Sequence, residues 1–227
     1  MEPSSLELVE AAIAGTGWKS AGLALEARAP EAACAHAIIT AYRSGRCEAW
    51  MAAWLLGANG HADGYETVLA ILRSGAGKGS ESYAGVALAK MRGDDALPDL
   101  VAILDEPHHE RWVHEGAAFG LGEIRDPRAL EALLAAVDRG RVRESKAGFI
   151  AHEHGVTPIR LLAWLRGDDA TRCEIAAWAV LHWSANTAVA GPIPEDICRV
   201  LLDHIKAGRS PFNSEQREFM RERLSRR

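Results

Sequence analysis

The chain has 227 residues, of which 48% are hydrophobic and 25% charged, and this composition excludes a wholly disordered protein. Its formal net charge is -5, so its overall field repels phosphate backbones and disfavours general binding to nucleic acid. The most apolar stretches, residues 49–58 and 175–183, are far shorter than the roughly 20 residues needed to cross a bilayer. The four cysteines form no CxxC pair and the N-terminus lacks a secretory signal, so we expect reduced thiols and a cytoplasmic location.

The N-terminal part of the chain predicts short helices. A first helix is predicted over residues 6–14, and residues 1–17 are expected to cap the fold. A weak helix pair follows in residues 20–43, around Pro30. Residues 52–72 then show an Ala-rich helix, a short Gly/Asp turn and a Leu-rich helix in that order. This order is the first sign of an internal repeat.

The repeat is clearest in residues 83–104 and 111–137, where both segments have the same order of an Ala-rich helix, a turn and a Leu-rich helix. Their alignment gives a period of roughly 31–33 residues, which lies within the range of helical solenoids. It places Ala87 on Ala118, Leu88 on Phe119, Ala96 and Leu97 on Ala129 and Leu130, and Leu100 on Leu133.

The C-terminal part continues the pattern. Residues 141–167 form a weaker unit, and residues 173–183 repeat the Ala-rich helix with Trp178 at the position of Phe119. Trp54 aligns with the same position upstream, and we expect both tryptophans to lie in the core. A polar helix over residues 212–227 is expected to cap the C-terminal end.

Three aspartates in the turns are expected to cap the helices that follow them. These are Asp95, Asp126 and Asp169, and Pro127 is expected at the first helical position after Asp126. No segment shows the strict alternation of a half-buried strand. The sequence therefore predicts an all-α protein.

The string WVHEGAAFGLGEIRDPRALEALL, within residues 111–134, resembles the HEAT-like repeat family, in particular the short subtype of phycobilin lyase subunits. The resemblance implies a right-handed α-solenoid, here of about six HEAT-like helix pairs in a single domain over residues 1–227. It also implies that the second helices of the pairs line a concave surface that binds a partner. The segments expected on this surface are residues 67–73, 97–104, 129–137, 159–165 and 197–205.

A solenoid of this kind favours a non-catalytic scaffold or adaptor that binds a protein or peptide partner. Trp and Arg are enriched in binding hot spots, so the cluster PHHERW and one upstream tryptophan are the candidate contacts. The candidate partner-binding residues are His108, His109, Arg111, Trp112 and Trp50. We predict no catalytic residue and no cofactor, and the sequence identifies neither the partner nor the oligomeric state.

Two other functions remain open. The His114-Glu115 pair resembles the His-Glu pairs with which deoxyhypusine hydroxylase holds iron, although that family needs four pairs in register and this chain lacks them. A metal-dependent or bilin-lyase-like enzyme is therefore an alternative, with His114, Glu115, His152 and Glu153 as candidate metal ligands. HEAT-like folds also include DNA glycosylases, so binding of a DNA lesion is the second alternative.

Overall fold

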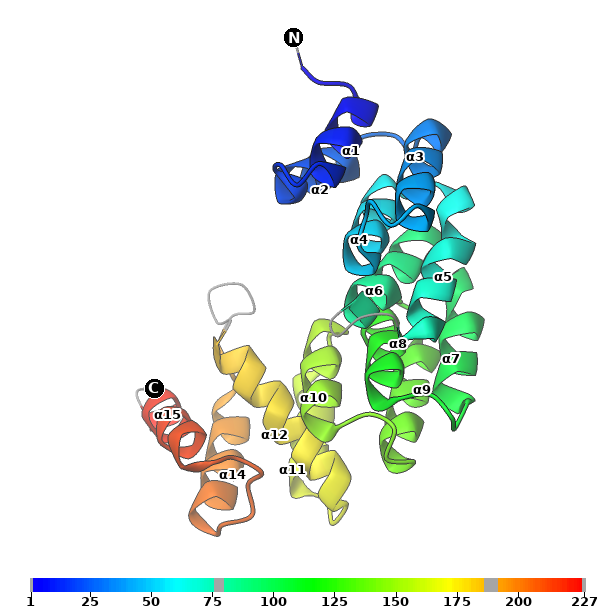
Figure 1. The fold of residues 1–227 in the computed structure, drawn as a ribbon. Coiled ribbons are helices and arrows are strands. Elements are labelled where there is room, and N and C mark those ends of the chain that lie inside the picture. The colour runs from blue at the N-terminus through cyan, green and yellow to red at the C-terminus, as the bar shows by residue number, and fades with distance from the viewer. Residues whose placement is uncertain (1, 76–79, 186–191, 226–227) are drawn as a thin grey trace. The chain divides into compact units, whose positions relative to one another are not determined.

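The computed structural model describes residues 2–75, 80–185 and 192–225, and every regular element in these ranges is helical (Figure 1). This confirms the all-α prediction. The chain divides into two compact units, Met1–Ala132 and Leu133–Arg227, and the division falls inside α9 (Pro127–Asp138). The single domain predicted over residues 1–227 stays a prediction. None of the helices in the described ranges is both long and apolar enough to span a bilayer.

Unit 1 is a stack of helix pairs joined by short turns, two of which are 3₁₀ helices. Its helices before α9 are α1 (Ser5–Ile13), α2 (Trp18–Glu26), α3 (Ala32–Arg43), α4 (Ala49–Asn59), η1 (Ala62–Gly64), α5 (Tyr65–Ser74), α6 (Ser80–Arg92), η2 (Gly93–Ala96), α7 (Leu97–Asp105) and α8 (Arg111–Glu123). The first helices of successive pairs, α2, α4, α6 and α8, pack against one another in that order. Figure 1 shows α4, α6 and α8 along one side of the stack and α3, α5 and α7 along the other. This arrangement confirms the predicted α-solenoid.

Small residues allow the first helices to approach closely. A Cβ atom added to Gly85 on α6 would collide with the carbonyl oxygen of Gly116 on α8, and one added to Gly120 would lie 2.5 Å from the carbonyl oxygen of Gly85. The two helices therefore touch backbone to backbone, which only glycine permits.

The Leu-rich second helices supply the core of unit 1. Leu100, Ile103 and Leu104 on α7 are fully buried, as are Ile71 and Leu72 on α5. Each second helix therefore turns its apolar stripe inward and leaves a polar face outside, as helical periodicity predicts.

The predicted helix caps are confirmed at two of the three aspartates. The carboxylate of Asp126 accepts a hydrogen bond from the backbone N–H of Arg128 at 2.8 Å, and that of Asp169 accepts one from Arg172 at 2.9 Å. The prediction for Asp95 is wrong, because Asp95 lies inside η2, which runs directly into α7. Its neighbour Asp94 instead accepts from the backbone N–H of Arg125 in the next repeat, at 3.2 Å.

Unit 2 has a core of its own. After α9 its described helices are α10 (Glu144–Glu153), α11 (Pro158–Arg166), α12 (Ala170–Ala185), α14 (Glu195–Lys206) and α15 (Ser214–Ser225). α10 packs on α12, α11 packs on both α12 and α14, and α15 packs on α14 and α12. The C-terminal helix is polar by composition, yet its Met220 and Leu224 are buried in this core together with Phe212 just before it.

Candidate functional site

Four aromatic side chains gather on the first-helix layer of unit 1. Trp18 on α2 lies edge-on to Trp50 and Trp54 on α4, with ring centroids 4.9 and 6.2 Å away. Tyr83 on α6 completes the group, 6.1 Å from Trp50 and 5.8 Å from Trp54. We call these four residues the aromatic cluster. The three tryptophans are half-buried and Tyr83 is 38% exposed, so the rings present apolar area to the surface.

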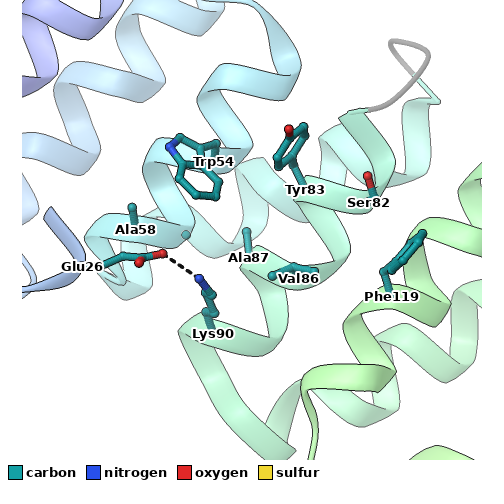
Figure 2. A pocket seen from close by; sticks show the side chains of 10 residues that line it. Glu26, Trp54, Ala58, Ser82, Tyr83, Val86, Ala87, Lys90 and Phe119 are labelled. Carbon is teal, nitrogen blue, oxygen red and sulfur yellow. Dashed lines mark hydrogen bonds and ion pairs between the residues drawn. The ribbon is translucent and has the colours of Figure 1, made fainter. Parts of the chain in front are cut away.

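An apolar cavity of about 310 Å³ opens beside this cluster. Figure 2 shows Trp54, Tyr83, Val86 and Phe119 around it, on three successive first helices. Gly57 on α4 and Ala87 on α6 also line the cavity, and the contact between these two small residues brings α4 and α6 together. The full lining consists of Glu26, Trp54, Gly57, Ala58, Ser82, Tyr83, Val86, Ala87, Lys90 and Phe119.

The cavity corrects two predictions made from the repeat. Trp54 was expected in the core, but it is half-buried at the cavity wall, in the same place on α4 that Phe119 holds on α8. The alignment of Leu88 with Phe119 is also wrong, because Leu88 is fully buried, whereas Val86 is half-buried and lines the cavity as Phe119 does. The predicted alignment of α6 with α8 is therefore displaced by two residues. Both helices are rich in alanine and offer few large side chains that could fix the alignment.

Charged groups at the cavity are paired. Lys90 Nζ lies 2.6 Å from Glu26 Oε1, the ion pair drawn in Figure 2, and 5.8 Å from the centre of the Trp54 ring. At the cluster, the indole N–H of Trp50 donates a hydrogen bond to the Glu48 carboxylate at 2.5 Å. The rim thus offers one acid and one cation beside the apolar surface.

The predicted partner-binding residues lie at two places in unit 1. Trp50 belongs to the aromatic cluster, whereas His108, His109, Arg111 and Trp112 occupy the turn between α7 and α8 and the start of α8. Trp112 is 41% exposed and Arg111 is exposed. Their role as contacts stays a prediction.

The four predicted metal ligands fall on two helices, one pair on α8 of unit 1 and the other on α10 of unit 2. His114 and Glu115 are buried on α8, and Nε2 of His114 donates to the backbone carbonyl of Glu106 at 2.8 Å. In unit 2, the half-buried ring of His152 stacks on Trp183 with centroids 6.3 Å apart, and the side chain of Glu153 lies outside the described residues. A metal site made by these four residues stays a prediction.

A different group of metal-binding side chains does converge on the turn between α7 and α8. The ligand atoms of Glu106, His108 and His109 all lie within 4.8 Å of one another. The sequence signal was present in the string EPHH, but the two histidines were predicted as partner contacts and Glu106 was not considered.

Unit 2 holds a second, more polar cavity of about 580 Å³, lined among others by Cys173, Glu174, His204 and Arg209. Cys173 Sγ lies 3.2 Å from Nδ1 of His204. Burial raises the pKa of the Cys173 thiol, whereas burial and then the positive charge of Arg209 lower the pKa of His204. Both groups are therefore neutral near pH 7, and a neutral thiol is a poor nucleophile.

The first helix α12 of unit 2 carries Trp178 at the position that aligns with Trp54 and Phe119. The Trp178 ring packs edge-to-face on Phe212, with centroids 5.3 Å apart. Phe212 is 3% exposed, and the segment before α15 brings it there. Trp178 itself is half-buried, as Trp54 is, and in unit 2 the chain's own C-terminal segment packs against this repeat position.

Comparison with known proteins supports the repeat architecture. Residues 113–139, within the α8–α9 pair, match the family model of the PBS lyase HEAT-like repeat, which confirms the resemblance over this segment. No curated protein and no solved structure matches the chain significantly. The match describes a repeat fold and specifies no function.

Proposed function

We propose that this chain is a non-catalytic scaffold or adaptor that binds a protein or peptide at the aromatic cluster and apolar cavity of unit 1. The observation that carries the proposal is the set of four half-buried or exposed rings beside a cavity lined by apolar side chains. Aromatic side chains at a surface pocket provide most of the energy in many protein interfaces. The binding surface then lies on the first-helix layer rather than on the second helices, whose large apolar side chains are used in the core.

The charges at the cavity favour a peptide over nucleic acid. Its lining contains one carboxylate and one ammonium group, Glu26 and Lys90, and these are paired with each other. A nucleic-acid site needs several cations that follow a phosphate backbone. A polypeptide with a mixed rim of charges can pair with both groups at the edge of an apolar contact.

Unit 2 indicates what kind of side chain fits. There, Phe212 from a non-helical stretch packs edge-to-face on the half-buried Trp178, which aligns with the cavity residues Trp54 and Phe119. The first-helix layer therefore accepts an aromatic anchor at this repeat position. We propose that the partner inserts an aromatic or long aliphatic side chain into the cavity of unit 1.

We also propose that the protein acts in the cytoplasm. All four cysteines are free, and Cys34, Cys47 and Cys198 are buried. Free thiols fit a reducing compartment.

Selection from a random peptide library displayed on phage tests the binding function directly. We expect tag-free protein to enrich peptides with a Phe, Trp or Leu anchor. Tyr83→Ala should weaken the selected peptides by about tenfold or more, since loss of a hot-spot aromatic often costs about 2 kcal/mol. Fluorescence anisotropy of labelled synthetic peptides measures this change.

Two variants keep the experiment decisive. Val86→Lys places a charge in the cavity wall and should abolish binding, whereas Ile159→Ala removes an exposed apolar side chain on α11 of unit 2 and should leave affinity unchanged. Selected peptides that bind the Tyr83 and Val86 variants as well as they bind the parent protein would contradict the proposed site. Circular dichroism of each variant confirms that the helices remain folded.

A further inference from the structure

The turn between α7 and α8 brings three metal-binding side chains to one point in unit 1. Oε2 of Glu106 lies 2.7 Å from Nε2 of His109 and 3.5 Å from Nε2 of His108. The two imidazole rings are neighbours, with centroids 4.9 Å apart. All three ligand atoms lie within 4.8 Å of one another, and the distances of 2.7 and 3.5 Å lie on either side of the roughly 3.3 Å that separates two ligand atoms on one tetrahedral Zn²⁺.

The contact between Glu106 and His109 is not an ordinary hydrogen bond. Nε2 of His109 is fully buried, and no described group meets the geometry of a hydrogen bond with it, although the carboxylate oxygen lies at hydrogen-bond distance. The oxygen therefore approaches the ring nitrogen from the side. Two ligand atoms placed side by side in this way can point at a common third atom, whereas a donor and its acceptor point at each other.

We infer that Glu106, His108 and His109 form a binding site for a divalent metal ion of the zinc class. Two imidazole nitrogens and one carboxylate oxygen are ligands that Zn²⁺ prefers, whereas Mg²⁺ and Ca²⁺ take oxygen ligands. Three protein ligands leave the fourth tetrahedral position open for water. The site is separate from the aromatic cluster and does not depend on the proposed function.

The backbone of the turn holds Glu106 in place for this role. Its N–H donates to the carbonyl oxygens of Ala102 and Ile103 at the end of α7, at 3.1 and 3.3 Å. Its own carbonyl oxygen accepts from the buried His114 at 2.8 Å. One ligand is thus fixed from both sides by backbone contacts that a side-chain substitution at Glu106 leaves intact. His109 is fixed by burial, since its side chain is only 12% exposed, while His108 is 73% exposed and free to move to an ion.

Another histidine–acid group in unit 1 offers a matched control. His36 and His61 lie 3.2 and 3.6 Å from the carboxylate of Asp63, but their ligand atoms are not all mutually close. His36 is exposed, as is His108. A metal that binds any surface histidine would respond to substitution at either group.

The test is a titration of tag-free, chelator-treated full-length protein with Zn²⁺ in a calorimeter, with Co²⁺ absorption as a second readout. We expect one equivalent of Zn²⁺, visible Co²⁺ bands that Zn²⁺ abolishes, and no heat with Mg²⁺. Glu106→Gln and His109→Ala should each weaken Zn²⁺ binding by about tenfold or more, because loss of outer-shell partners alone costs that much. His36→Ala should bind as the parent protein does.

Two results would overturn the assignment. One is a parent protein that binds no Zn²⁺ beyond the level of the His109→Ala variant. The other is equal loss of binding in the His36→Ala and His109→Ala variants, which indicates non-specific surface histidines. Glu106→Gln retains the size of the side chain and the backbone contact to His114, so circular dichroism and the thermal midpoint separate lost binding from lost folding.

Discussion

The same repeat position has different neighbours in the two units. Trp54 and Phe119 line an open apolar cavity in unit 1, whereas Trp178 in unit 2, half-buried as Trp54 is, packs against Phe212. The first helices that carry these residues are similar in sequence, so the helix itself does not decide what lies against this position. What differs is that unit 2 has a C-terminal segment that folds back onto its own first-helix layer.

The cavities of the two units also differ in chemistry. In unit 1 the lining is mainly aromatic and aliphatic, with the ion pair of Glu26 and Lys90 beside it, but in unit 2 the cavity contains a thiol, an imidazole, a carboxylate and a guanidinium. Unit 2 packs its own C-terminal segment on its first-helix layer, whereas the proposed function assigns that layer of unit 1 to a partner.

The largest expected change in stability comes from truncating Phe212 in unit 2. Phe212→Ala deletes a buried aromatic side chain and should lower the free energy of unfolding by about 3–5 kcal/mol. Tyr83→Ala in unit 1 removes an exposed ring and should cost less than about 1 kcal/mol. Denaturant unfolding measures both. Equal costs for the two variants would show that the segment before α15 does not stabilise unit 2.

A smaller loss is expected from the glycine contact of unit 1. Gly85→Ala forces a methyl group against the backbone of α8 and should destabilise the protein by about 1–3 kcal/mol through overpacking. Gly167→Ala is the matched control at an exposed position of unit 2, where the nearest atom to the new methyl group is 3.3 Å away. The thermal midpoint reports both changes. If the two variants melt alike, α6 and α8 are not held at backbone contact.

Loss of a surface ion pair should lower the free energy of unfolding by less than the two changes above. The loss should also be larger in unit 2 than in unit 1. Arg172 in unit 2 donates two hydrogen bonds to Asp138, at 2.9 and 2.8 Å, whereas Lys90 in unit 1 makes one contact with Glu26. We expect Asp138→Asn to cost more than Glu26→Gln, with both below about 1 kcal/mol because both pairs are solvent-exposed. Unfolding at low and high salt measures the difference. If Glu26→Gln lowers the free energy of unfolding more than Asp138→Asn does, the second hydrogen bond from Arg172 to Asp138 adds no stability.

The smallest change concerns the titration of His204 in unit 2. Its pKa is lowered in the folded state, first by burial and then by Arg209, while Asp203 and a backbone contact with Leu165 oppose the shift. The unfolded chain therefore binds this proton more readily, so the contribution of His204 is complete above its ordinary pKa of 6.5 and is lost as the pH falls below it. Unfolding measured at about pH 7.5 and about pH 5.5 should show a weaker pH dependence for His204→Gln than for the parent protein. An unchanged pH dependence would contradict the lowered pKa.

The helices themselves were predictable from the sequence, and the strongest repeat was predicted best. The start of α8 at Arg111 and of α9 at Pro127 follows from helical periodicity and from Asp126 as the cap. The weaker register on α6 failed, because several alanines in a row allow the same helix to be aligned two residues away. The cap at Asp95 failed because Asp95 lies inside the 3₁₀ helix η2, which runs directly into α7, and local propensity does not distinguish such a turn from an ordinary helix start.

The candidate sites were predictable only in part. Trp50 was chosen for its residue type, and it does belong to the aromatic cluster. Its neighbours Trp18 and Tyr83 come from other repeats, so no local pattern connects them. Glu106 was missed because its approach to His109 depends on the backbone path of a turn, where no periodic rule applies.

The sequence by itself determined that this chain is all-α and that its helices come in repeated pairs. The reason is that periodicity along one helix is set by its own geometry, at 3.6 residues per turn. Only the tertiary structure decided that Trp54 lines a cavity while Trp178 packs against Phe212, and that Glu106 meets two histidines. These outcomes depend on the lateral register of neighbouring helices and on where a distant segment packs, and both follow from the packing of many side chains at once.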